Sequence, residues 1–108
     1  MAGKQAVQRI ADLPDSPLAA SAHYFAEHLH EARAALAKPD VNALAIVIPH
    51  AGTDHDDWRR ALARDLAREY TPQRVNVVGG GAEPATEALL TYLANAPGVT
   101  GQYCPVHD

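Results

Sequence analysis

The sequence predicts an α/β protein in which four strands alternate with three helices along a single domain of 108 residues. An unbroken apolar run at residues 43–48 is typical of a strand that is covered on both faces, as in a parallel sheet. A charged amphipathic helix at residues 54–70 leads through a turn into a short apolar strand at residues 74–78. A helix that feeds a short buried strand is half of a β-α-β unit, so the flanking segments are interpreted in the same way.

The two outermost strands are expected at the edges of the sheet. The first, residues 5–10, is half polar, and its lysine, glutamine and arginine neighbours are residues that protect an exposed edge. The last, residues 102–106, contains Pro105, which has no N–H to donate to a neighbouring strand.

The first helix is expected to run without a break over residues 16–38, with Ser16 as its cap and Pro17 in its first position. Apolar residues recur along it at steps of four and three and form one stripe: Leu18, Ala22, Phe25, Leu29, Ala32 and Leu36. A narrow, regular stripe of this kind can pack on another helix, although packing on the chain's own sheet is its commoner use.

The second helix, residues 54–70, carries an apolar stripe that includes Trp58 and Leu62. Thr53 or Asp54 is the expected cap. A row of arginines on its flank, Arg60, Arg64 and Arg68, is expected to be solvated. A third helix is expected over residues 83–96.

Right-handed crossovers place the first two helices on one face of the sheet if the strands are added in one direction. The third helix alone then covers the other face. A sheet with one half-covered face is a reason to expect self-association.

The composition excludes several classes of protein. The net charge of −4 argues against a nucleic-acid partner held through phosphates. No stretch approaches the ~20 apolar residues of a membrane span, and the first residues lack the apolar region of a secretory signal. A lone cysteine, Cys104, fits a reducing compartment, so a cytoplasmic protein is expected. Cys104 itself is interpreted as a small, buried apolar residue rather than a nucleophile.

Three short motifs follow one another along the chain: Leu66-Ala67-Arg68-Glu69, Arg74-Val75-Asn76-Val77-Val78 and Val99-Thr100-Gly101-Gln102. In order and approximate spacing they resemble the L-A-x-E helix end, the R-V-N strand and the closing T-G-Q segment of the short-chain dehydrogenase/reductase family. The resemblance covers the chain from about residue 16 onward and implies a Rossmann-like fold.

The same resemblance implies that the family's catalytic parts are missing. Its dinucleotide-binding half has no counterpart, and the glycines at 79–81 fail as G-x-G-x-x-G because the sixth position is Pro84. The catalytic Y-x-x-x-K would place its tyrosine and lysine near Gly52 and Asp56, which cannot replace them. No catalytic residue is carried over and no cofactor is expected, so the resemblance implies a truncated, pseudoenzyme-like relative.

In that family the two helices that match the first and second helices here commonly form a dimer, as a four-helix bundle across a twofold axis. The resemblance therefore implies an interface built from these residues: Leu18, Ala22, Phe25, Leu29, Ala32, Trp58 and Leu62. The partner is a second copy of the chain or a full-length short-chain dehydrogenase.

Two loops are weaker candidates for ligand binding. His50, Asp54 and His55 follow the second strand, where open α/β sheets place ligands, but their spacing matches no metal motif and acids at a helix start have an ordinary explanation. Gly79, Gly80 and Gly81 could cradle a phosphate; the alternative, a turn with positive φ angles, is favoured.

The leading hypothesis is thus a non-catalytic interaction module that associates through its first two helices. The second hypothesis is small-molecule, nucleotide or metal binding, with residual oxidoreductase-type activity, at the loops after the second and third strands.

Overall fold

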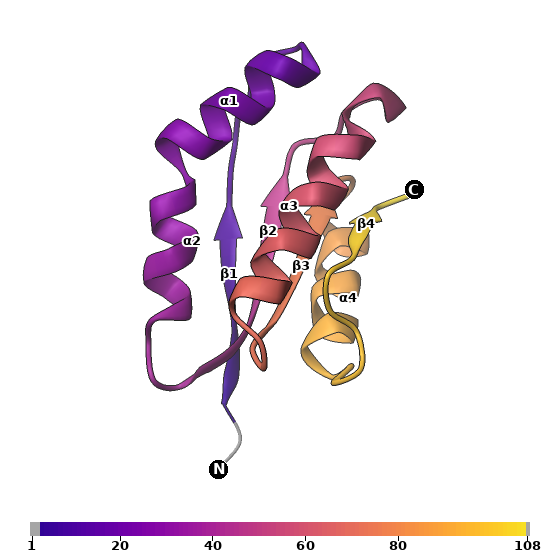
Figure 1. Ribbon diagram of the computed structural model, residues 1–108. Helices are drawn as coiled ribbons and strands as arrows, with labels where there is room; N and C mark the ends of the chain where they lie inside the picture. The colour runs from indigo at the N-terminus through magenta and orange to yellow at the C-terminus, as the bar shows by residue number, and fades with distance from the viewer. Residues whose placement is uncertain (1–2, 108) are drawn as a thin grey trace.

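The computed structural model describes residues 3–107 and shows a four-stranded sheet flanked by helices (Figure 1). The strands are β1 (Lys4–Arg9), β2 (Val41–Ile48), β3 (Arg74–Gly79) and β4 (Tyr103–Pro105). They lie in the order β1-β2-β3-β4, and every neighbouring pair is parallel. The predicted parallel α/β sheet, with the first and last strands at its edges, is confirmed.

Helices cover the two faces unequally. The elements are α1 (Pro17–Glu27), α2 (Leu29–Leu36), the 3₁₀ turn η1 (Thr53–His55), α3 (Asp56–Glu69) and α4 (Glu83–Ala94). Because side chains alternate along a strand, Leu44, Ile46 and Ile48 of β2 pack in the larger core with α1, α2 and α3. Ala45 and Val47 pack against α4 on the other face. Figure 1 shows α4 alone behind the sheet, as the sequence predicts.

This arrangement makes the third crossover unusual. The sheet grows in one direction from β1 to β4, yet α4 lies on the face opposite to α3 (Figure 1). The connections through α1–α2 and through α3 are right-handed, so the connection from β3 through α4 to β4 is left-handed. Right-handed crossovers are the strong rule in parallel sheets, so specific contacts must hold β4 in place.

The side chains of the R-V-N and T-G-Q motifs supply those contacts. Asn76 is buried; its Nδ2 donates to the Val99 carbonyl (3.0 Å), and its Oδ1 accepts from the Gln102 amide (3.1 Å). The Val75 amide donates to Thr100 Oγ1 (3.0 Å), and the Gly101 amide returns a bond to the Val75 carbonyl (2.7 Å). Gly101 has a φ of 72°, which favours glycine at this turn.

The expectation of one unbroken first helix is wrong. The helix ends at Glu27 and restarts at Leu29, with His28 between them at φ −124° and ψ −22°. Gln8 of β1 stabilises the break, because its Nε2 donates to the His28 carbonyl (2.8 Å) and its Oε1 accepts from the buried Tyr24 hydroxyl (2.9 Å). Figure 1 shows that α1 leans away from the direction of α2. The cap at Ser16 is as predicted, since its Oγ accepts from the Ala19 amide (3.1 Å).

The expected cap of the second predicted helix is also wrong. The 3₁₀ turn η1 occupies Thr53–His55, so α3 begins at Asp56, and neither Thr53 nor Asp54 makes a side-chain cap bond to it. The acids at the helix start still lie near the positive end of its dipole. Asp56 lies within ion-pair distance of Arg60 (3.6 Å), one turn further along α3.

Candidate functional site

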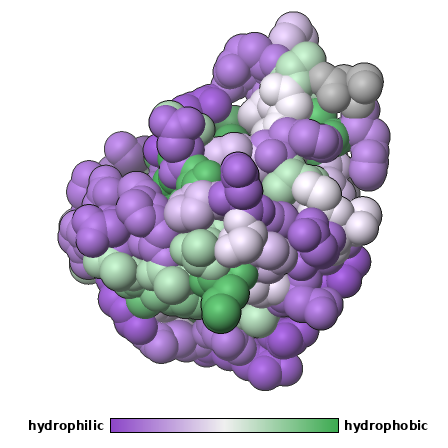
Figure 2. Space-filling view, turned by 90° about the horizontal axis from the view of Figure 1, so that it is seen from above, coloured by the Kyte–Doolittle hydropathy of each residue, from purple (hydrophilic) through white to green (hydrophobic). Residues whose placement is uncertain are grey.

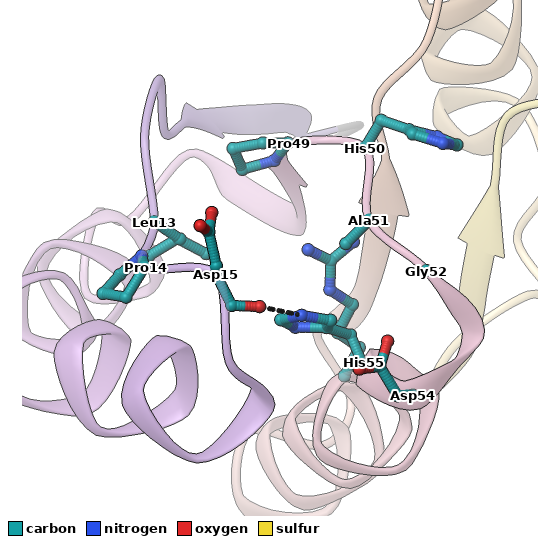
Figure 3. Close-up of a pocket in the computed structure, with 10 residues that line it drawn as sticks. Leu13, Pro14, Asp15, Pro49, His50, Ala51, Gly52, Asp54 and His55 are labelled. Carbon is teal, nitrogen blue, oxygen red and sulfur yellow. Dashed lines mark hydrogen bonds between the residues drawn. The ribbon is translucent and has the colours of Figure 1, made fainter.

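A cavity of about 260 Å³ opens beyond the carboxyl end of β2 (Figure 3). One wall comes from the loop before α1, with Leu13, Pro14 and Asp15, and the other from residues 49–55. Parallel α/β sheets bind ligands beyond the carboxyl ends of their strands. The loop after β2, which the sequence indicates as a candidate ligand site, therefore borders a hollow at that end of the sheet.

His55 closes one side of this cavity with both of its ring nitrogens engaged. The ring is buried, and its Nε2 lies 2.9 Å from the carbonyl oxygen of Asp15 (Figure 3). Its Nδ1 accepts from the indole N–H of Trp58 (3.1 Å). An indole N–H only donates and a carbonyl only accepts, so these partners specify a neutral imidazole protonated at Nε2.

The structure does not bring the metal candidates together. Figure 3 shows His50 pointing away from Asp15 and His55, while the His55 nitrogens already have partners. Across residues 3–107 no three His, Cys, Asp or Glu side chains form a group that could hold a metal ion. His55 fastens the start of α3 to the loop before α1.

Arg59 is the residue at this cavity that the sequence did not single out. It lines the hollow and is only 1% exposed, and among residues 3–107 its side chain makes one hydrogen bond, from Nη1 to the Tyr103 hydroxyl (3.2 Å). Its Nε is buried with no acceptor, and it joins no ion pair among the described residues.

Two aromatic rings partly compensate for this buried charge. The Arg59 guanidinium carbon lies 5.5 Å from the Trp58 ring centroid and 5.7 Å from that of Tyr103. Such cation–π contacts are worth roughly 0.5–2 kcal/mol each. Taking an ion out of water costs several kcal/mol, so the residues that the structure describes compensate the charge of Arg59 incompletely.

The glycines at residues 79–81, at and after the end of β3, offer few free backbone amides to a phosphate. The Gly80 amide donates to the Ile48 carbonyl (2.8 Å), and the Gly81 amide donates to Thr86 Oγ1 (3.2 Å). The predicted positive φ is wrong for Gly79 and Gly80, because Gly101 is the one glycine with a positive φ in the described part of the chain. Gly79 instead permits a close approach, since a Cβ there would lie 2.6 Å from the Tyr103 hydroxyl oxygen.

The residues of the expected helix interface divide into two groups. Ala32 and Leu62 are buried in the chain's own core, and the partly buried Leu29 and Trp58 pack against it, so the stripe is not wholly available to a partner. The break at His28 turns the first half of the stripe outward, and Leu18, Ala22 and Phe25 remain exposed.

A small hollow of about 90 Å³ has Phe25, one of these exposed residues, in its lining. Phe25, Leu29, Leu62 and Leu66 give it apolar walls from α1, α2 and α3. Arg33 and Glu69, which form an ion pair between α2 and α3, stand at its border.

The sequence model of the SDR-like family, described as short chain dehydrogenase-like protein, matches residues 8–106. The chain belongs to the SDR-like family. No curated protein and no solved structure matched in the corresponding searches.

Membership of the SDR-like family confirms the resemblance seen in the three motifs, and the structure shows what two of them do. The R-V-N and T-G-Q segments bind each other around Asn76, so they are structural elements of β3 and β4. Gly52 and Asp56, the positions near which a catalytic tyrosine and lysine would fall, lie in the loop before η1 and at the start of α3. Within residues 3–107 no helix has the length and apolar character needed to cross a bilayer.

Proposed function

We propose that this SDR-like chain is a non-catalytic protein that forms a homo-oligomer through the face made by α1, α2 and α3. The observation that carries this proposal is the exposure of large apolar side chains there: Leu18 is 83% exposed and Phe25 49%. Seen from above, hydrophobic side chains gather on the side that carries α1, within a largely hydrophilic surface (Figure 2). Isolated exposed apolar residues are ordinary, but a group beside an apolar hollow is typical of an interaction surface.

The local geometry favours a second copy of the chain as the occupant. Phe25 stands at the border of the hollow between α1–α2 and α3 and offers a ring that a matching hollow can receive. In a twofold dimer the same patch meets itself, so the Phe25 of each copy would enter the hollow of the other. The four-helix dimer that is common in short-chain dehydrogenases uses the corresponding helices, which supports the same arrangement.

The absence of catalysis is proposed from the residues at the expected catalytic positions. Glycine at position 52 has no acid to offer, and the carboxylate of Asp56 has the wrong charge to lower the pKa of a tyrosine. Asp56 lies 3.6 Å from Arg60 instead, an ordinary helix-surface pair. Titration with oxidised and reduced nicotinamide cofactors should therefore show no binding; stoichiometric binding would overturn this half of the proposal.

Sedimentation velocity of matched variants tests the assembly. The unmodified chain should sediment as a dimer or higher homo-oligomer, and Leu18→Asp and Phe25→Asp should each weaken association by at least about tenfold. Both side chains are exposed, so the circular dichroism of the monomer should not change. Tyr92→Asp is the matched control, because Tyr92 is 59% exposed on α4, across the sheet, and its substitution should leave the oligomer intact.

Three outcomes would overturn self-association through this face. The unmodified chain could remain a monomer at high concentration, or Phe25→Asp could keep the native oligomer, or Tyr92→Asp could dissociate it. A monomer that binds a full-length dehydrogenase of the same organism would replace the second copy with that partner.

A further inference from the structure

We propose that the cavity at the end of β2 is a binding site for a small carboxylate, and that Arg59 is its anchor. This site does not depend on how the chain assembles. Arg59 is 1% exposed, lines the hollow, and has no carboxylate within ion-pair distance in the described part of the chain.

The surroundings of Arg59 hold it in place without neutralising it. Trp58 and Tyr103 lie at 5.5 and 5.7 Å from the guanidinium carbon, and the Tyr103 hydroxyl accepts its one hydrogen bond. Trp58 is itself fixed by its bond to His55, which is fixed in turn to the Asp15 carbonyl. A guanidinium held by two rings and one neutral hydroxyl oxygen has fixed geometry and spare donors, and an arriving anion need not order it.

The charges around the cavity favour a carboxylate over a phosphate. Asp15 and Asp54 also line the hollow, and both residues are exposed. A phosphate dianion would meet one arginine and two carboxylates, whereas a single carboxylate can pair with the guanidinium through parallel N–H···O bonds. The rest of such a ligand would be neutral or cationic where it faces the aspartates.

The cavity also explains why an incompletely compensated charge sits at this position. Replacing a buried ion by an apolar side chain of similar volume is often neutral or stabilising, so folding alone does not require arginine here. Residues that are costly for folding and that border a hollow are typical of binding sites. Methionine at position 59 would fill similar space without the charge.

Nuclear magnetic resonance offers a direct test with propionate as the probe. The Arg59 Nε–H is buried, so its signal should be resolved from those of solvated arginines. Propionate at constant ionic strength should shift this signal and the Gly52 amide saturably, while inorganic phosphate and chloride should not. Arg59→Met should weaken propionate binding by at least about tenfold. Arg64→Met, which removes the same charge from an exposed position of α3, should leave it unchanged.

The proposal is overturned if propionate leaves the Arg59 signal in place, if phosphate or chloride shifts it equally, or if Arg59→Met retains the affinity. Should Arg59→Met fail to fold, the titration of the unmodified chain still decides, because it needs no substitution. Arg59→Lys then serves as the second variant, since it keeps the charge but loses the planar pair of donors.

Discussion

Cys104 shows how burial sets the chemistry of a single residue. It is half-buried in β4 against the smaller apolar cluster, and burial raises the pKa of its thiol. The neutral thiol is therefore the form that the folded state prefers. Stability from this preference is present below the unfolded pKa and is lost as the pH rises through the higher, folded pKa.

Alkylation of Cys104 by iodoacetamide should consequently reach half of its maximal rate at a higher pH in the folded protein than in the urea-unfolded chain. Cys104 is the chain's one cysteine, so mass spectrometry of the intact protein follows it without interference. Equal midpoints in the two states would show that burial does not control this thiol.

The burial of Arg59 and its contact with Tyr103 could not be predicted from the sequence. The sequence shows four arginines on one helix and favours a solvated row, which is sound for Arg60, Arg64 and Arg68, all exposed. Arg59 precedes Ala63 by four residues and Ala67 by eight, and both alanines are buried. That spacing places Arg59 on the edge of the core-facing side, but only the fold shows that Tyr103, 44 positions later, meets it.

At the scale of elements, we expect the pairing of β3 with β4 to require a glycine at position 79. An added Cβ would lie 2.6 Å from the Tyr103 hydroxyl and 3.3 Å from the Pro105 Cα. Gly79→Ala should therefore lower the free energy of unfolding by about 1–3 kcal/mol, measured by urea denaturation. Gly98→Ala is the control, because no atom lies within 4 Å of its added Cβ.

The second part of this test removes the obstructing hydroxyl. Tyr103→Phe should relieve the overlap, so the double variant should be more stable than the sum of the single effects by at least about 0.5 kcal/mol. Strict additivity would mean that the Tyr103 hydroxyl is not what excludes a side chain at position 79.

The break between α1 and α2 shows why element boundaries escape sequence patterns. The apolar stripe continues across His28 without a glycine or proline, so periodicity predicts one helix. The break depends on Gln8, twenty residues away, whose amide reaches both the His28 carbonyl and the Tyr24 hydroxyl. The sequence indicates only that Gln8 protects an edge strand, and its bonding role becomes visible only when strand and helix are side by side.

For the whole molecule, the parallel sheet and its two edge strands follow from local patterns, because each strand and helix is marked by its own residues. The cavity does not, because its walls come from loops some forty residues apart, before α1 and after β2. The left-handed third crossover also has no local signal. It depends on contacts between β3 and the segment before β4 that the R-V-N and T-G-Q motifs make together.

Asn76 is expected to be the residue on which that last crossover depends most. It is 1% exposed, and its side chain holds the Val99 carbonyl and the Gln102 amide at 3.0 and 3.1 Å. Asn76→Ala breaks both bonds and leaves two backbone groups without their partner, so the free energy of unfolding should fall by about 2–4 kcal/mol. Asn95→Ala removes one exposed bond, to the Thr91 carbonyl, and should cost far less.

Amide hydrogen exchange separates a local from a global effect of Asn76→Ala. If Asn76 fastens β4 to β3, the amides of Gly101, Gln102 and Val106 should lose protection well before those of β2, which lies at the centre of the sheet. Tyr103 would then be released from Arg59, so the loosening should extend to the cavity. Uniform loss of protection across β2 and β4, or equal effects of Asn76→Ala and Asn95→Ala, would show that the crossover does not depend on this side chain.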